Sequence, residues 1–320
     1  MTVLFWGECD LPNGPGNVNR GFQTHLSRNF LRPGHRNRYL RLLQGMGMLC
    51  ASRVLVVSGV SRQGCILAGL AAILRKKTLF LLHGSALRES RWHPNEKLRR
   101  QEAFLMERAD LLLTVSRTFR DWIVQTYPQY REKVDFLYPG VDFPPERERT
   151  PIAGTVAAAG GDGGIKGNDI LARAVRHLPG TRLTVFGPAT PGTEQAGLCY
   201  TGRLPRERFW QALSRTELFV VNSHFESFSL SALEALHLGC SLLISEHAGA
   251  AELLPLWESD VIHDPKDEQE LARKIGHLLR HPNNRRLREG LNWEALSWET
   301  ACKTLEQFCA QLGKGGIAGG

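Results

Sequence analysis

Two glutamates, Glu226 and Glu234, stand eight residues apart and bracket a serine-rich stretch that leads into an apolar helix pattern. Ser227, Ser229 and Ser231 occupy positions typical of helix N-caps, and the apolar pattern ends at a glycine. The start of a helix has free backbone N–H groups and the positive end of the helix dipole, which suit an anion. The stretch therefore predicts an anion site beside two carboxylates.

Other residues suited to chemistry follow predicted strands. His83 follows the apolar segment 78–82, Lys166 follows a glycine run after the segment 154–159, and Gly14 and Gly16 follow the segment 3–7. Ligands of open α/β sheets bind at the carboxyl ends of strands, so a histidine placed there is more often functional than part of the core. The two glycines are a weaker signal, because a plain turn between a strand and a helix is about as frequent as a ligand loop.

Apolar strand segments alternate with helical patterns along the chain, and residues 144–151 interrupt the alternation. This interruption is rich in proline and charge, as is typical of a linker. We therefore predict an α/β protein with two Rossmann-like doubly wound domains that face a cleft. The predicted boundaries are residues 1–146 for the N-terminal domain, residues 147–312 for the C-terminal domain and residues 313–320 for a flexible tail.

The composition describes a folded protein with a basic surface. The 320 residues are 42% hydrophobic and 22% charged, and the net charge is +8. Such a charge suits nucleotide phosphates, nucleic acid or an anionic membrane surface. The aromatic residues do not alternate with the basic ones as a base-stacking surface requires, so no nucleic-acid partner is expected. The arginine-rich segment 28–41 is either a solvated basic face or a surface for anionic lipid or an anionic acceptor.

The sequence also predicts the compartment. The apolar runs are too short to span a bilayer, and the first residues form a strand pattern in place of a signal peptide. The seven cysteines are dispersed, without a CxxC pair or a metal-ligand spacing. We therefore expect reduced thiols, a cytoplasmic location and no transmembrane helix.

Residues 226–234 resemble the E-x7-E signature of retaining glycosyltransferases with the GT-B fold, most closely those of glycosyltransferase family 4. The resemblance covers most of the chain, because further segments similar to motifs of that family occur in the same order: His83–Gly84, residues 109–116, residues 139–142, Lys166–Gly167, Gly239, and Gly249 with Glu252.

The resemblance implies that a sugar is transferred from a nucleotide diphosphate sugar with retention of its anomeric configuration. It implies that Glu226 is close to the donor sugar, that Glu234 holds the ribose hydroxyls, and that His83 lies against the sugar from the other domain. The diphosphate is expected to contact Lys166 and the backbone around Phe228, Ser229, Leu230 and Ser231, while Gly14 and Gly16 allow the first loop to close over the phosphates. No metal is expected, because Lys166 and the helix start supply positive charge and the chain contains no DxD motif.

One position departs from the family pattern. The family usually has an arginine six residues before the lysine, where this chain has Gly160. Arg173, Arg203 or an arginine of the first domain is expected to replace it, or else the diphosphate is held more weakly. A donor site without transfer activity is the alternative.

We therefore predict a metal-independent retaining hexosyltransferase. Its partners are a nucleotide-sugar donor, a glycan or lipid-linked acceptor of bacterial surface polysaccharide synthesis, and the anionic inner face of the plasma membrane. The alternatives are another two-domain nucleotide-sugar enzyme, such as an epimerase or a glycogen-synthase-like polymerase, and a non-catalytic nucleotide-sugar-binding protein.

Overall fold

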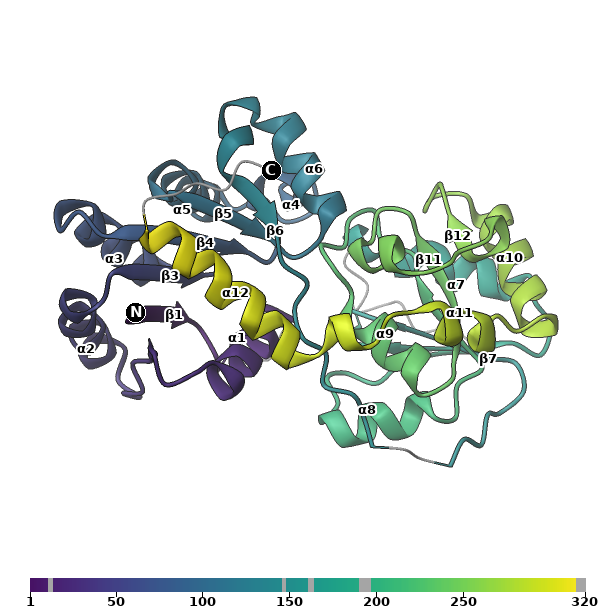
Figure 1. The fold of residues 1–320 in the computed structure, drawn as a ribbon. Helices are drawn as coiled ribbons and strands as arrows, with labels where there is room; N and C mark the ends of the chain where they lie inside the picture. The colour runs from purple at the N-terminus through teal and green to yellow at the C-terminus, as the bar shows by residue number, and fades with distance from the viewer. Residues whose placement is uncertain (11–13, 146–147, 161–163, 190–196, 315–320) are drawn as a thin grey trace. The chain divides into compact units, whose positions relative to one another are not determined.

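The computed structural model describes residues 1–10, 14–145, 148–160, 164–189 and 197–314. The chain forms two compact units, one from Met1–Gly140 with Trp293–Gly320 and one from Val141–Asn292 (Figure 1). Each unit is built on a six-stranded sheet whose strand pairs are all parallel. The prediction of two Rossmann-like α/β domains is confirmed.

The first unit has the strand order β2-β1-β3-β4-β5-β6. Its strands are β1 (Val3–Gly7), β2 (Phe30–Leu31), β3 (Val54–Ser58), β4 (Lys77–Leu82), β5 (Leu111–Thr114) and β6 (Val134–Phe136). Its helices are α1 (Gly14–His25), α2 (Arg38–Ala51), α3 (Arg62–Ile73), α4 (Ala86–Glu89), α5 (Glu96–Arg108), α6 (Arg117–Thr126), η1 (Pro128–Lys133), η5 (Glu294–Leu296) and α12 (Trp298–Gly313). Strands β2 and β3 pair with opposite sides of β1, so the strand order reverses there and the carboxyl ends of β1 and β3 form a topological switch point.

The second unit has the strand order β12-β11-β10-β7-β8-β9. Its strands are β7 (Thr155–Ala159), β8 (Arg182–Phe186), β9 (Leu198–Tyr200), β10 (Leu218–Val221), β11 (Ser241–Ser245) and β12 (Val261–Ile262). Its helices are η2 (Gly164–Lys166), α7 (Asn168–Arg176), α8 (Arg206–Leu213), α9 (Leu230–His237), η3 (Gly249–Leu253), η4 (Glu258–Asp260), α10 (Glu268–Arg280) and α11 (Asn284–Gly290). This is the strand order of dinucleotide-binding folds, and its switch point lies between β7 and β10.

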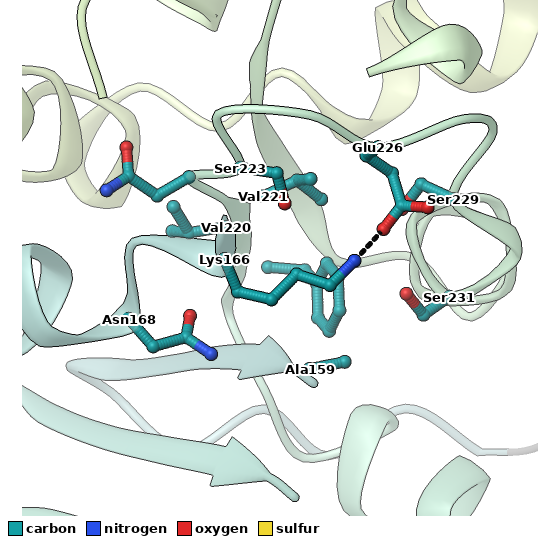
Figure 2. A pocket seen from close by; sticks show the side chains of 11 residues that line it. Ala159, Lys166, Asn168, Val220, Val221, Ser223, Glu226, Ser229 and Ser231 are labelled. Carbon is teal, nitrogen blue, oxygen red and sulfur yellow. Dashed lines mark hydrogen bonds and ion pairs between the residues drawn. The ribbon is translucent and has the colours of Figure 1, made fainter. Parts of the chain in front are cut away.

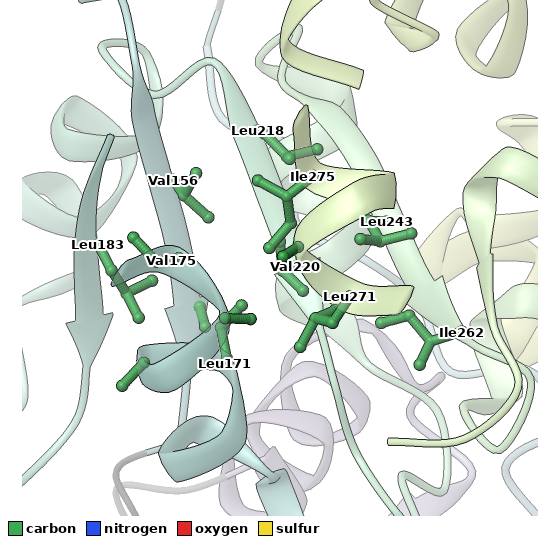
Figure 3. Close-up of a cluster of buried hydrophobic side chains, with 14 of the residues drawn as sticks. Val156, Leu171, Val175, Leu183, Leu218, Val220, Leu243, Ile262, Leu271 and Ile275 are labelled. Carbon is green, nitrogen blue, oxygen red and sulfur yellow. The ribbon is translucent and has the colours of Figure 1, made fainter. Parts of the chain in front are cut away.

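Helices cover the second sheet on both faces because its strands are apolar on both faces. Figure 3 shows the core under α7 and α10, where alternate strand residues such as Val156, Leu218 and Val220 pack against Leu171 and Ile275. Successive strand side chains point to opposite faces, so the residues between them face the other side of the sheet, where α9 packs on β10 and β11. The helix that carries Glu234 is thereby fixed to the strand that leads into the Glu226 loop.

The last helix belongs to the first unit, so the predicted assignment of residues 293–312 to the C-terminal domain is wrong. Helix α12, drawn in yellow in Figure 1, packs against α1, β3 and β4. Trp298 at its start lies edge-on to Phe22, with ring centroids 5.3 Å apart, and stacks on His25 at 5.5 Å. A Cβ on Gly21 or on Gly140 would overlap the Trp298 ring, so both glycines make room for this anchor.

The predicted linker 144–151 is part of the second unit. Within it, Arg149 donates hydrogen bonds to the backbone carbonyls of Leu238 at 3.1 Å and Thr216 at 3.2 Å. These hydrogen bonds attach the segment to the second unit, whereas a free linker has no such attachment. Residues 146–147, and residues 315–320 of the predicted tail, lie outside the described part of the chain.

One local prediction differs from the structure. Gly14 and Gly16 lie in the first turn of α1 and not in a loop before it. Helix α1 ends at His25, and Phe30 belongs to β2. Helix α8 begins at Arg206, directly after Pro205. Across the described ranges, the helices are too short or too polar to cross a membrane.

Candidate active site

A hollow opens at the switch point of the second sheet, where the segments after β7 and β10 separate. It is lined by Ala159, Lys166, Asn168, Phe219, Val220, Val221, Asn222, Ser223, Glu226, Ser229 and Ser231. Among these described residues, Lys166 carries the one positive charge and Glu226 the one negative charge (Figure 2). The hollow is open to solvent, and the space of about 220 Å³ between these side chains includes part of that solvent.

Lys166 ends the short helix η2 and reaches across the hollow to Glu226. Its ammonium group forms an ion pair with the Oε2 atom of Glu226, and both side chains remain partly exposed, at 25% and 21%. Gly160 makes this reach possible. A Cβ at Gly160 would lie 3.1 Å from Cε and Cγ of Lys166, and its φ of +107° disfavours any residue with a side chain. The position where the family usually has an arginine is thus covered by the stem of Lys166.

Gly167 fixes the backbone that follows the lysine. Its φ is +58°, and a Cβ there would lie 2.4 Å from the backbone oxygen of Asn222. The Asn222 side chain closes the same contact by donating to the carbonyls of Gly167 at 2.9 Å and Pro265 at 3.0 Å. The two segments that carry Lys166 and Glu226 therefore contact each other at Gly167, where their backbones lie too close together for a side chain.

Gly167→Ala should lower the free energy of unfolding by about 2–4 kcal/mol, since it combines left-handed backbone strain with a backbone clash. Gly180→Ala is the matched control. Gly180 has a φ of +77° but nothing lies within 4 Å of its Cβ position, so only the strain term of about 1 kcal/mol should appear. Urea unfolding measures both values, and equal losses would contradict the proposed close contact.

The loop that carries Glu226 is fixed by backbone hydrogen bonds. Glu226 N donates to His247 O at 3.1 Å, Gly249 N donates to Glu226 O at 2.9 Å, and Ala250 N donates to Phe228 O at 2.7 Å. These bonds tie the loop to the segment after β11, so the position of the carboxylate does not depend on its ion pair alone.

Helix α9 begins at Leu230 and presents Ser229 and Ser231 to the hollow (Figure 2). Ser229 occupies the N-cap position as expected, but its φ is +89° and its side chain makes no capping hydrogen bond. Phe228 is buried and Leu230 does not line the hollow. The predicted glycine end is confirmed, because Gly239 has a φ of +88° and the bonds Gly239 N to Leu236 O and Cys240 N to Ala235 O close the helix.

Glu234 lies one turn along α9 from Ser231, on the same face of the helix. It is buried, at 6% exposure, and burial raises the pKa of its carboxyl group although nearby Arg206 lowers it. Arg206 donates to its Oε1 atom at 2.6 Å and also pairs with Asp142. The structure thus gives each of the two glutamates its own cation.

His83 belongs to the first unit, directly after β4. Ser58 donates its hydroxyl hydrogen to Oδ1 of Asn19 at 2.6 Å, and the Ser58 hydroxyl oxygen lies 2.8 Å from Nε2 of His83. The Asn19 amide nitrogen donates to the backbone of Glu8 at 3.1 Å, which orients its oxygen toward Ser58. The hydroxyl has one hydrogen, so His83 must donate from Nε2. Burial lowers the pKa of His83 to about 4, and the ring is therefore neutral at pH 7.

The other predicted residues lie outside the hollow. Arg173 pairs with Asp169 at 3.6 Å and with Glu268 at 3.0 Å, and Arg203 is exposed, so neither lines the hollow. Gly14 and Gly16 lie in the first unit. In the described ranges, no group of three or more His, Cys, Asp or Glu side chains is arranged to hold a metal ion.

The fold is that of a two-domain α/β protein with two parallel, doubly wound sheets, and comparisons with known proteins identify its family. The profile of the family "Glycosyl transferases group 1" matches residues 166–291, and that of "Glycosyltransferase Family 4" matches residues 6–143. The chain belongs to glycosyltransferase family 4, with the GT-B fold.

Curated relatives are more distant. Glycogen synthase of Mycobacterium tuberculosis is 26% identical over 230 residues, which cover 62% of this chain and 55% of the relative. A D-inositol 3-phosphate glycosyltransferase of Segniliparus rotundus is 28% identical over 250 residues, covering 68% of this chain and 56% of the relative. The chain thus spans about half the length of the curated relatives it matches.

Solved structures share the fold at low sequence identity. The Anabaena protein HepE in complex with UDP-glucose has a TM-score of 0.72 at 14% identity, covering 97% of this chain and 100% of that one. The lipopolysaccharide outer core galactosyltransferase WaaB has a TM-score of 0.68 at 13% identity, covering 97% and 99%.

Sequence reasoning missed Arg206 and Asn222. Arg206 lies in none of the motifs of the family resemblance, and its partners are distant in sequence. Asn222 carries a recognisable signal, since it is a polar residue at the carboxyl end of the apolar strand β10, at the switch point.

Proposed function

We propose that this protein transfers a hexose from a nucleotide diphosphate sugar to a glycan or lipid-linked acceptor, with retention of configuration and without a metal ion. The observation that carries the proposal is the Lys166–Glu226 pair across the hollow at the β7/β10 switch point, beside the start of α9. Family membership supports it, and so does the UDP-glucose bound by the structural neighbour HepE.

In this proposal the two charges separate when the donor binds. The diphosphate attracts Lys166 and the N-terminal end of α9, while Glu226 turns to the sugar and Glu234 accepts from the ribose hydroxyls. His83, Gly14 and Gly16 act from the first unit. During transfer the bond from the anomeric carbon to the diphosphate oxygen breaks, a bond to the acceptor oxygen forms on the same face, and the proton of the acceptor hydroxyl passes to the departing diphosphate. Preorganised positive charge at the departing diphosphate contributes most to such a step.

The test is a two-stage assay. A thermal-shift panel of UDP, GDP, ADP and their sugars identifies the donor, since a ligand that binds the folded state raises the unfolding midpoint. Donor turnover is then followed with and without EDTA, and the product's anomeric configuration is read by NMR. We expect one nucleotide to dominate, turnover to survive EDTA and the configuration to be retained. Loss of activity with EDTA or inversion would refute those parts, and binding without turnover would favour a non-catalytic protein.

We further propose that the protein works at the inner face of the plasma membrane of a bacterium, in surface polysaccharide synthesis. Helix α2 supports this, because its apolar residues Tyr39, Leu40 and Leu43 are 62%, 47% and 62% exposed beside the exposed Arg36 and Arg38. An exposed apolar and basic helix face suits an anionic bilayer surface.

The membrane proposal predicts sedimentation with anionic liposomes at low salt and release at high salt. Leu40→Ser combined with Leu43→Ser should reduce sedimentation, because both side chains are exposed and contribute apolar area to the bilayer. Failure of the wild-type protein to sediment would end this proposal and leave the transferase assay untouched.

A further inference from the structure

The second glutamate of the site is held by an arginine that the family resemblance does not assign. Arg206 is the first residue of α8, and its guanidinium joins Glu234 at 2.6 Å and Asp142. It also stacks over the Trp210 ring, with 4.8 Å from its central carbon to the ring centroid. Three contacts on one side chain fix its position although it is 40% exposed.

Glu234 needs this partner because it is buried. A carboxylate without a counter-ion in such a place takes up a proton, since burial disfavours the charged form. Burial raises the pKa of Glu234, Arg206 lowers it and Asp142 raises it. The buried Trp210 indole N–H also lowers the pKa, although it makes no hydrogen bond of normal geometry in the described part of the chain.

Other charged groups lie on the elements around Glu234. Strands β10 and β11 pack against α9 and carry no titratable side chain. Besides Arg206, helix α8 carries Glu207 and Arg208, and α9 itself carries His237. Helix η3 brings Glu252, and α11 brings Arg285, Arg286, Arg288 and Glu289. None of these appears among the main influences on Glu234, whereas both Arg206 and Asp142 do. The charge state of Glu234 is therefore set chiefly by burial and by Arg206.

We propose that Arg206 is a positioning residue of the donor site: it occupies one oxygen of Glu234 and keeps the carboxylate ionised, so that the other oxygen accepts from the ribose of the nucleotide. The inference rests on the proposed function, in which Glu234 binds ribose. In this proposal α8 positions the carboxylate that binds the ribose, while η2 positions Lys166, which binds the diphosphate.

The consequence is a pH dependence with a defined sign. An ionised Glu234 accepts hydrogen bonds from ribose on its free oxygen, and protonation weakens this acceptor. Without Arg206 the pKa of Glu234 rises further, so nucleotide binding should weaken from the acid side at a higher pH than in the wild type. A residue that only stabilised the fold would shift no pH midpoint.

The experiment measures the dissociation constant of UDP by calorimetry between pH 5 and pH 9 for the wild type, Arg206→Gln and Arg206→Lys. GDP and ADP are run in parallel. At each pH, the dissociation constant of a variant is divided by that of the wild type. This ratio removes the effect of the titration of the nucleotide's own phosphates, which is the same for both proteins. We expect Arg206→Gln to weaken binding at least tenfold at pH 6, with most of the loss recovered at pH 9, and Arg206→Lys to retain most of the affinity.

Two controls separate the outcomes. Arg208→Gln changes an exposed arginine of the same helix and should leave the UDP profile unchanged. In a Glu234→Gln background, Arg206→Gln should have little further effect, because there is no longer a carboxylate to keep ionised. A loss that is independent of pH and persists in this background would overturn the inference and place Arg206 on the phosphates. Absence of nucleotide binding by the wild type would instead refute the proposed function.

Discussion

Glu226→Gln should lower the turnover number by roughly 100- to 1,000-fold while the protein stays folded. The amide keeps the shape of the side chain and removes its charge, and transfer of a glycosyl group passes through a transition state with positive charge on the sugar ring. Loss of one preorganised electrostatic contact at a reacting centre has effects of this size. The backbone bonds that tie the Glu226 loop to residues 247–250 do not involve the side chain, so the loop should keep its place.

The two glutamates are distinguished by which constant changes, the turnover number or the dissociation constant of the nucleotide. Glu234→Gln should chiefly raise the dissociation constant of the nucleotide, because its proposed contact is to ribose, away from the bond that breaks. Glu289→Gln, which changes an exposed carboxylate of α11 that pairs with Arg285, serves as the control and should change neither constant. Steady-state kinetics with the identified donor measures the turnover number, and calorimetry with its nucleotide measures the dissociation constant. Equal, small effects of Glu226→Gln and Glu234→Gln would contradict the assigned roles.

The fold was predictable, and so was the placement of Lys166 and Glu226 after two strands of one sheet, because both follow short-range rules. Strand–helix alternation determines a doubly wound sheet, and ligands bind where strand order reverses. Lys166 and Glu226 each follow a strand that borders the β7/β10 switch point, and the structure brings them into an ion pair. Gly167 was recognised as a motif, and its reason is geometric: the backbone of Asn222 occupies the space of a side chain.

What the sequence did not reveal depends on contacts between distant residues. Helix α12 returns to the first unit through its packing on α1, β3 and β4, which includes the contacts of Trp298 with Phe22 and His25. Periodicity carries no information about which domain a helix joins. Arg206 is likewise defined by partners 28 and 64 residues away. Arg173 and Arg203, the named candidates for the missing arginine, do not line the hollow, whereas Arg206 pairs with Glu234.

Lys166→Ala should weaken nucleoside diphosphate binding by about 1.5–3 kcal/mol, the range for a hydrogen bond to a charged group. This corresponds to a roughly 10- to 150-fold higher dissociation constant. The effect should be near the upper end, because Lys166 is the one cation among the described lining residues and Gly160 offers no second one. Binding of the unphosphorylated nucleoside should change little, and the salt dependence of diphosphate binding should decrease.

The ion pair with Glu226 complicates this prediction in a way that can be measured. In the wild type, donor binding must break the ion pair between Lys166 and Glu226. The Lys166→Ala variant does not have this pair to break, and this offsets part of the attraction to the diphosphate that it loses. A double-mutant cycle with Glu226→Gln isolates that part: if the lysine turns to the diphosphate, Lys166→Ala should cost more in the Glu226→Gln background than in the wild type, since there the lysine starts without a carboxylate partner. Lys303→Ala, an exposed lysine of α12, is the control. Unchanged diphosphate affinity in Lys166→Ala would show that the lysine serves only to hold Glu226 and that the diphosphate binds elsewhere.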